Sequence, residues 1–109
     1  DAEGRLLAIF DVFDEWFHRE DFEACTFVNV LLEMGADHPL GRASTSHLAH
    51  IRQMVSDFAV EAGLRDPEEF ALSWHILMKG SIVEASEGHR GAALRAKRMG
   101  IALIESHRL

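Results

Sequence analysis

Apolar residues recur at helical spacing along nearly the whole chain, and this periodicity limits the fold more than any other feature. Leu6, Phe10, Phe13 and Phe17, for example, follow one another at intervals of three or four residues. Such spacing places side chains on one face of an α-helix. No segment alternates apolar and polar residues as a half-buried strand would, and no Asn-Gly or Asp-Gly hairpin turn occurs. We therefore expect an all-α protein.

The pattern predicts a five-helix bundle with recognisable helix ends. The clearest start is Asp66-Pro67, which offers an N-cap aspartate and a proline at the first helical position. Gly35, Gly63 and Gly88 are expected to end the second, third and fourth helices, because glycine adopts the left-handed conformation that terminates them. The expected helices cover residues 2–18, 24–34, 39–62, 67–87 and 90–107.

Three of these helices have more apolar surface than packing on one side requires. The helix at 24–34 is apolar almost all round, which is typical of a central helix. The helix at 67–87 has two apolar stripes, and the helix at 90–107 has a broad apolar face. One stripe of the helix at 67–87 consists of Phe70, Trp74, Leu77 and Ser81. The other consists of Leu72, Ile76, Gly80 and Val83. The broad face of the helix at 90–107 consists of Leu94, Ile101 and Ile104, with Ala92, Ala96, Met99 and Leu103 beside them.

Length, charge and cysteine content exclude several classes of protein. The 109 residues suffice for one domain with a core of its own. A net charge of −7 gives no general attraction to a nucleic-acid backbone. A single cysteine excludes an intrachain disulfide framework, and no run of 18 apolar residues could span a membrane. No secretory signal is visible, so we expect a cytoplasmic protein without membrane contact.

Short motifs in the chain do not add up to a metal or catalytic site. Glu15 and His18 have the Glu-x-x-His spacing of di-iron bundles, but such a site needs two of these motifs and the chain has one. His47 and His50 could reach one metal, yet zinc usually takes three or four ligands. Cys25 has an apolar flank typical of a small buried residue rather than a nucleophile. We expect no metal, no cofactor and no enzymatic activity.

Asn29 and His75 are polar residues among apolar neighbours, and the sequence leaves their role open. They could be core polar groups with internal hydrogen-bond partners. They could equally be polar anchors in an apolar ligand cavity.

Four stretches occur in an order that matches a known family. They are the helix at 6–17 (Leu-Leu-Ala-Ile-Phe-Asp-Val-Phe-Asp-Glu-Trp-Phe), the stretch at 21–29 (Asp-Phe-Glu-Ala-Cys-Thr-Phe-Val-Asn), Asp37-His38-Pro39 before the long helix, and Asp66-Pro67-Glu68. Together they resemble the C-terminal domain of the tetracycline-repressor (TetR) family of bacterial transcription regulators. The stretch at 21–29 is similar to the F-x-G-C-x-F-x-N pattern of one subgroup, except that Glu23-Ala24 stands where that subgroup often has a glycine.

The resemblance implies that residues 1–109 are an effector-binding and dimerisation domain. The family's N-terminal helix-turn-helix domain is not in this chain, so contact with DNA would occur only through that missing half. The family pattern further implies a homodimer, in which the last two helices of each copy form a four-helix interface, and a small, largely apolar effector. Effector binding would shift the first helix and so change the spacing of the two DNA-reading heads.

Candidate site residues follow from helical faces rather than from the family, because its pockets differ widely. The predicted ligand pocket consists of Phe13, Phe17, Cys25, Val28, Asn29, Leu32, His50, Ile51, Met54, Trp74, His75 and Met78. The predicted dimer interface consists of Ile76, Gly80, Val83, Leu94, Ile101 and Ile104. The alternatives are a free-standing helical dimerisation or binding module and, behind it, a small helical enzyme that uses Cys25 or a histidine-bound metal.

Overall fold

The computed structural model describes residues 1–20, 22 and 39–109, with side chains from residue 49 onward in the last range. Within these residues the protein is all-α, which confirms the predicted class. The number of helices differs from prediction, since four are described where five were expected. The predicted helix at 24–34, with its stop at Gly35, lies outside the described residues. The four are α1 (Ala2–Phe17), α3 (Pro39–Glu61), α4 (Pro67–Ser86) and α5 (Ala92–His107).

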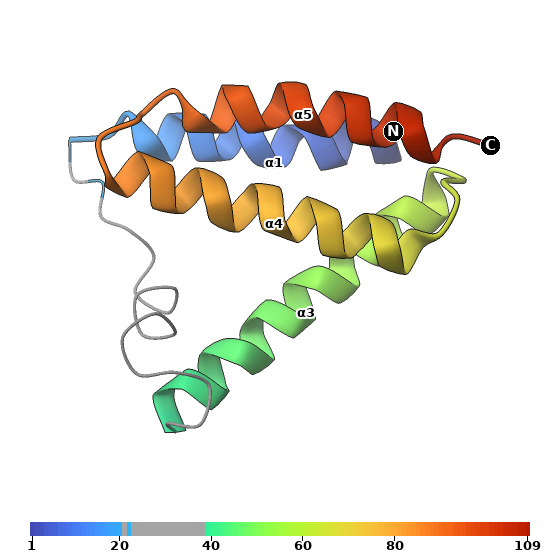
Figure 1. Cartoon of the computed structure of the whole chain (residues 1–109), viewed down its shortest axis with the longest axis horizontal. Coiled ribbons are helices and arrows are strands. Elements are labelled where there is room, and N and C mark those ends of the chain that lie inside the picture. Colours follow the sequence, from blue (N-terminus) through green and yellow to red (C-terminus); the bar gives the residue numbers. More distant parts are fainter. Residues whose placement is uncertain (21, 23–38) are drawn as a thin grey trace.

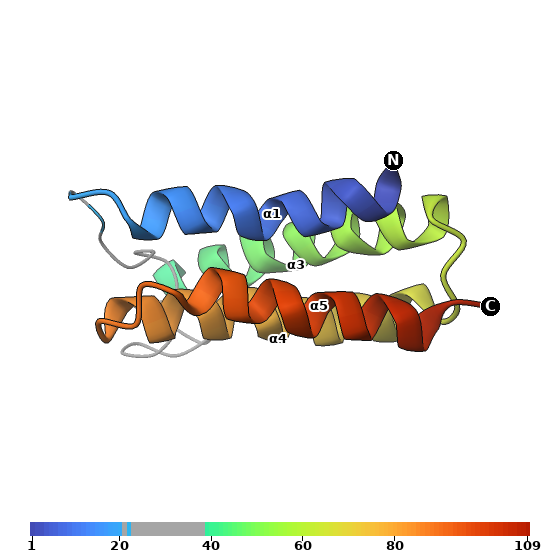
Figure 2. The same ribbon diagram turned by 90° about the horizontal axis from the view of Figure 1, so that it is seen from above.

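Three helices run along the length of the molecule and the fourth crosses them obliquely (Figure 1). Helices α1, α4 and α5 lie roughly along one direction, whereas α3 is inclined and diverges from α4 toward its own N-terminus. Seen from above, α5 lies over α4, with α1 on one side (Figure 2). Helix α5 packs on α1 and α4, and α3 packs on α4 and α1, so the four helices enclose a common core.

Large aromatic side chains from α1 and α4 fill this core. The rings of Phe70 and Trp74 stack with centroids 5.2 Å apart, and Phe10 lies 5.1 Å from Trp74. All three are fully buried. Helix α5 approaches this cluster closely because Gly100 has no side chain there: a Cβ atom at Gly100 would lie 2.8 Å from the Trp74 ring. The aromatic cluster and this glycine therefore fix the packing of α5 on α4.

The helix ends follow the sequence signals, with one difference in detail. Gly63 and Gly88 have positive φ angles of 73° and 102° just beyond the ends of α3 and α4, as predicted. Helix α4 begins at Pro67 with Asp66 as its N-cap, also as predicted. The Asp66 side chain, however, makes no capping hydrogen bond. Its backbone is left-handed (φ 49°), a conformation that aspartate tolerates better than most residues.

Polar contacts tie the two ends of the described chain together. The backbone N–H of Arg65 donates to the carbonyl of His107 over 2.7 Å, and His107 Nδ1 donates to the carbonyl of Arg65 over 2.6 Å. Arg108 forms a 2.7 Å ion pair with Glu3, so the end of α5 is linked to both the α3–α4 connection and the first turn of α1. None of the described helices has the length and apolar character needed to cross a membrane.

Candidate functional site

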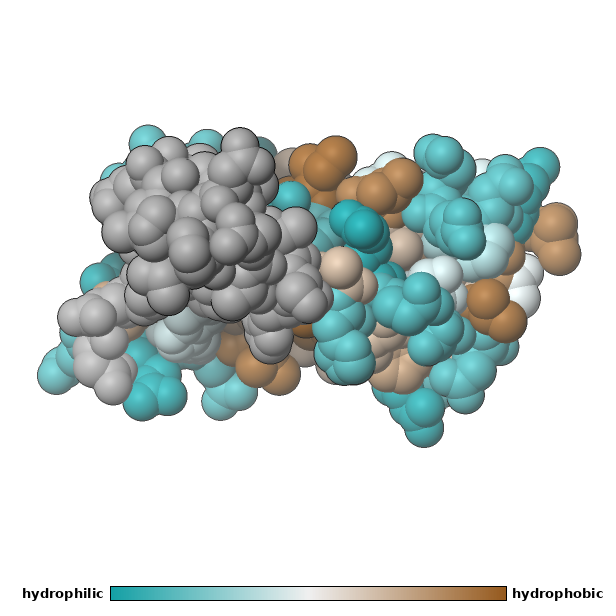
Figure 3. Space-filling model, turned by 90° about the horizontal axis from the view of Figure 1, so that it is seen from below, coloured by the Kyte–Doolittle hydropathy of each residue, from teal (hydrophilic) through white to brown (hydrophobic). Residues whose placement is uncertain are grey.

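Helix α4 presents its two predicted apolar stripes to opposite environments. Phe70 and Trp74 of the first stripe are fully buried, and Ser81 is buried with them. In the second stripe Leu72 is 45% exposed and Ile76 is 67% exposed. Apolar patches interrupt the hydrophilic surface in the space-filling view from below (Figure 3). The second stripe is thus apolar surface that packing within the described chain does not use.

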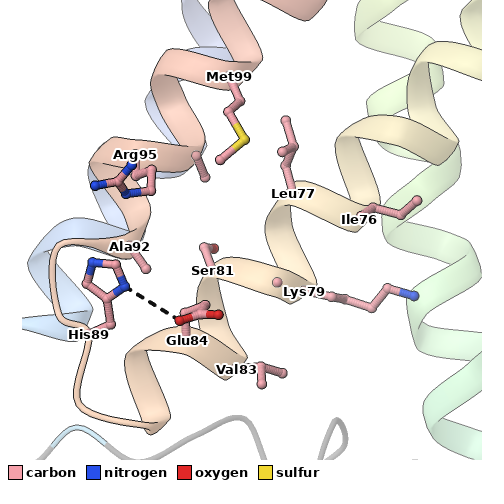
Figure 4. A pocket seen from close by; sticks show the side chains of 12 residues that line it. Ile76, Leu77, Lys79, Ser81, Val83, Glu84, His89, Ala92, Arg95 and Met99 are labelled. Carbon is pink, nitrogen blue, oxygen red and sulfur yellow. Dashed lines mark ion pairs between the residues drawn. The ribbon is translucent and has the colours of Figure 1, made fainter.

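An open groove of about 800 Å³ lies between α4 and α5, beside this exposed stripe (Figure 4). Leu77 of α4 and Met99 of α5 project toward each other across it. Small residues on both helices, including Gly80 and Ala96, also line the groove and leave space between the helices. Charged and titratable groups line it as well. The side chains of Lys79, Glu84, His89 and Arg95 belong to the lining, and His89 Nδ1 is 3.5 Å from a Glu84 carboxylate oxygen.

The six predicted dimer residues divide into three groups. Ile76, Gly80 and Val83 line the α4/α5 groove. Leu94 and Ile101 are exposed on α5 but do not line it. Ile104 is only 2% exposed because it packs into the core with Leu6 and Trp74, so its side chain is not available to a second copy in this conformation.

The twelve predicted pocket residues do not form one cavity among the described residues. Cys25, Val28, Asn29 and Leu32 lie outside them. Phe17, Trp74, His75 and Met78 are buried, and Phe13 and Ile51 are partly buried against the core. His50 and Met54 are exposed, because they lie one turn apart on a side of α3 that does not face the core. None of the eight that the structure describes lines the α4/α5 groove.

Among the predicted pocket residues, His75 is a buried polar residue with an unpartnered ring nitrogen and a lowered pKa. It is 3% exposed, and its Nε2 atom has no hydrogen-bond partner within the described part of the chain. Burial, together with the positive charges of Lys79 and Arg52, lowers the pKa of His75 from 6.5 to about 4. His75 is therefore neutral at pH 7. The indole nitrogen of the adjacent Trp74 is likewise buried without a partner among the described residues.

A second, smaller groove of about 390 Å³ separates α3 from α4 close to His75. Arg52 and Ser56 line it from α3, and Ala71 and Leu72 line it from α4. Ala71, His75 and Lys79 occupy successive turns of α4, so His75 and Lys79 continue the row that Ala71 begins. Figure 4 shows the Lys79 side chain extending away from α5. The positive charges that lower the pKa of His75 therefore come from α3, through Arg52, and from α4, through Lys79.

The other motifs form no metal site in the described structure. His18 Nδ1 donates to the backbone carbonyl of Asp14 over 2.8 Å, and Glu15 is exposed beside it. No group of three or more metal-ligating side chains occurs among the described residues. Cys25 and the side chain of His47 lie outside the residues whose side chains are described.

Sequence reasoning missed several residues at both grooves. Met99 belongs to the predicted broad apolar face of α5. A comparison of this face with the apolar stripes of α4 could have assigned Met99 to the groove. The sequence did not indicate that Arg52 and Lys79 line a groove. An isolated cation in a helical sequence is normally assigned to the solvated surface, and only the position of the neighbouring helix changes that assignment. No protein-family model, curated protein or solved structure matches the chain.

Proposed function

We propose that residues 1–109 are the effector-binding and dimerising domain of a TetR-like transcription regulator of the bacterial cytoplasm. A second copy of the chain would cover the exposed face of α4 and the α4/α5 groove. The observation that carries this proposal is the second apolar stripe of α4, in which Ile76 is 67% exposed although Phe70 and Trp74 of the first stripe are fully buried. The resemblance at 6–17 and 21–29 supports the choice of family.

A second copy is the occupant that fits this face best. Its lining combines apolar side chains, among them Ile76, Val83 and Met99, with a few charged ones, and a homodimer interface typically has an apolar core and a polar rim. A two-fold axis would bring the same patch of both copies together, so Gly80 of α4 would face its counterpart or lie near it. Nothing lies within 4 Å of a Cβ atom at Gly80 within the described chain, so a partner helix has room to approach.

Helix α1 is suited to carry a signal from the effector to a preceding DNA-binding half. It contacts α3, α4 and α5, so a shift of any of these helices reaches it directly. Its first turn is held by the Glu3–Arg108 ion pair, and its middle by the 2.8 Å contact of Asp11 with Lys97. An effector that favours one of two positions of α1 by about 1–3 kcal/mol would give the coupling typical of such regulators.

Sedimentation of matched charge variants tests the dimer. Ile76→Glu places a carboxylate in the centre of the proposed interface, whereas Val60→Glu places one at an equally exposed apolar site on α3 (67% and 61% exposed). We expect the parent chain and Val60→Glu to sediment as dimers and Ile76→Glu as a monomer with unchanged helix content. A monomeric parent chain, or equal dissociation of both variants, would contradict the proposal.

Two further variants locate the edge of the interface. Gly80→Arg fills the space beside α4 and is expected to give monomers, since Gly80 lines the groove. Ile101→Glu changes an exposed residue of α5 outside the groove, so dissociation by this variant would show that the interface extends beyond it.

The regulator class has its own test, independent of the dimer. The gene that encodes this chain is expected to encode, before Asp1, about fifty residues with a basic helix-turn-helix. A gene in which no such domain precedes Asp1 would instead favour a free-standing dimerisation or binding module.

A further inference from the structure

Two side chains of opposite charge flank the second apolar stripe of α4, one on each side. The stripe includes Ile76, Gly80 and Val83, which line the α4/α5 groove. Because a helical turn takes 3.6 residues, Lys79 and Glu84 lie on opposite sides of the line through these three. Figure 4 agrees, since the Lys79 side chain extends away from α5 and Glu84 lies on the side nearer α5. The stripe therefore has one basic edge and one acidic edge.

Both charges are open to a partner from outside the chain. Lys79 forms no ion pair and no side-chain hydrogen bond with the residues that the structure describes. One carboxylate oxygen of Glu84 lies 3.5 Å from His89 Nδ1, and the Glu84 side chain is 61% exposed. A carboxylate has about four acceptor sites, so this contact leaves room for a lysine. Lys79 and Glu84 both belong to the lining of the groove that the proposed second copy would cover.

The direction of the two α4 helices in a two-fold dimer decides which edges of the stripe meet. If the helices run parallel, the Lys79 edge of each copy faces the Glu84 edge of its partner. If they run antiparallel, like edges meet, and a pairing centred on the stripe places Lys79 beside Lys79 of the partner subunit. Charge complementarity therefore favours the parallel direction, because it brings opposite charges together at both edges.

The spacing of the two charges along α4 also fits parallel helices. In heptad notation, Ile76 and Val83 occupy d positions and Gly80 occupies an a position. Lys79 is then a g position, and Glu84 is the e position of the following heptad. Charges at g and e form the interhelical ion pairs that set partner choice and orientation in coiled coils. Gly80 lets the two backbones approach, since nothing lies within 4 Å of a Cβ atom there.

We infer that the α4 helices of two copies run parallel about the two-fold axis, and that Lys79 of each copy pairs with Glu84 of the partner subunit. This inference rests on the proposed function, because it names the direction and the polar contacts of the proposed dimer. Two-fold symmetry gives two such ion pairs in each dimer. They lie at the two edges of the apolar contact made by the second stripe.

Charge reversal tests the ion pairs and the direction of the helices together. In the parallel dimer, Lys79→Glu and Glu84→Lys each replace two attractions by two repulsions. Each variant is therefore expected to raise the dissociation constant of the dimer about tenfold or more. The double variant Lys79→Glu/Glu84→Lys restores both pairs and should recover most of the lost affinity. In an antiparallel dimer, like charges would still face each other after either single reversal, so neither would weaken it.

Sedimentation velocity over a series of protein concentrations measures these dissociation constants, and circular dichroism shows whether each variant is folded. Lys79→Glu and Glu84→Lys shift the net charge in opposite directions, so weakening by both does not come from overall repulsion. Lys79→Glu/Asp57→Lys keeps the net charge of the parent chain, but its new lysine is at an exposed position of α3 outside both grooves. This control should dimerise as weakly as Lys79→Glu. An equimolar mixture of the two single variants should form a heterodimer.

Several outcomes would overturn the parallel pairing. They are an unchanged affinity in Lys79→Glu or Glu84→Lys, a double variant that binds no more tightly than either single variant, or equal rescue by Asp57→Lys. The Ile76→Glu variant separates these outcomes from the fate of the proposed function. If Ile76→Glu dissociates the dimer and the charge reversals do not, only the direction and the ion pairs are lost. A parent chain that is monomeric contradicts both proposals.

Discussion

The two apolar stripes of α4 have nearly the same kind of residues and opposite surroundings. The inner stripe contains Trp74, which is fully buried between α1, α5 and the ring of Phe70. The outer stripe contains Ile76, two positions along, which is 67% exposed. Apolar character therefore does not tell core from interface on this helix. What distinguishes the stripes is whether a neighbouring helix of the same chain reaches them.

The largest effect should come from truncating one residue of each stripe. Trp74→Ala removes a fully buried ring and should lower the free energy of unfolding by about 3–5 kcal/mol. Ile76→Ala should change it by less than about 1 kcal/mol at dilutions where the chain is monomeric, since Ile76 buries little surface there. Urea unfolding followed by circular dichroism measures both. Equal losses at the two positions would mean that the monomer packs differently from the structure.

Acidification should lower the free energy of unfolding, because His75 on the buried side of α4 must then take up a proton. Its pKa is about 4 in the folded protein, against the ordinary histidine value of 6.5, so the unfolded chain binds more protons between these pH values. Stability should consequently fall as the pH drops from 6.5 toward 4 and level off below that. The ceiling of this loss is about 3 kcal/mol, because each pKa unit corresponds to about 1.4 kcal/mol.

The His75 contribution is obtained as a difference between variants, because carboxylates titrate in part of the same range. His75→Gln should remove part of the pH dependence of the unfolding free energy. His50→Gln, at an exposed position of α3, should leave it unchanged. Parallel pH profiles for all three proteins would refute a depressed pKa at His75.

Substitution by alanine should change the free energy of unfolding in opposite directions at Gly100, which packs against the inner stripe of α4, and at Gly80, which belongs to the outer stripe. A Cβ at Gly100 would lie 2.8 Å from the ring of Trp74, which Phe10 and Phe70 hold in place. Gly100→Ala is therefore expected to cost about 1–3 kcal/mol through overpacking. Gly80→Ala meets no atom within 4 Å and should stabilise the monomer by up to about 1 kcal/mol through helix propensity.

The effect of Gly80→Ala on stability should depend on the protein concentration. If a second copy packs closely against α4, Gly80→Ala should stabilise the chain at low concentration and weaken its dimer at high concentration. Thermal unfolding at a series of protein concentrations measures both effects. A gain in stability that is the same at all concentrations would place the interface away from Gly80.

Much of the local structure was predictable because it depends on near neighbours in the chain. Pro67, Gly63 and Gly88 mark helix ends through backbone geometry that each residue largely dictates by itself. The capping role of the Asp66 side chain was predicted wrongly. Its backbone is left-handed there, so the position is that of an N-cap but the side-chain hydrogen bond is absent.

The sites were predictable only in part. The sequence pointed to Ile76, Gly80 and Val83 together, because one helical stripe carries all three, and the structure places them at one groove. It gave no indication that Ile104 packs into the core or that His50 is exposed. Their positions depend on how α5 and α3 are rotated about their axes, and a broad apolar pattern does not fix that rotation.

By itself the sequence determined the all-α class, the ends of α3 and α4 and the excess apolar surface of α4. These follow from periodicity and from the conformations open to proline and glycine. Only the tertiary structure decided which stripe of α4 is buried, and only it placed the charge of Arg52 where it lowers the pKa of His75. Both depend on the approach of helices distant in sequence, because burial and electrostatic interaction are set by distance in space.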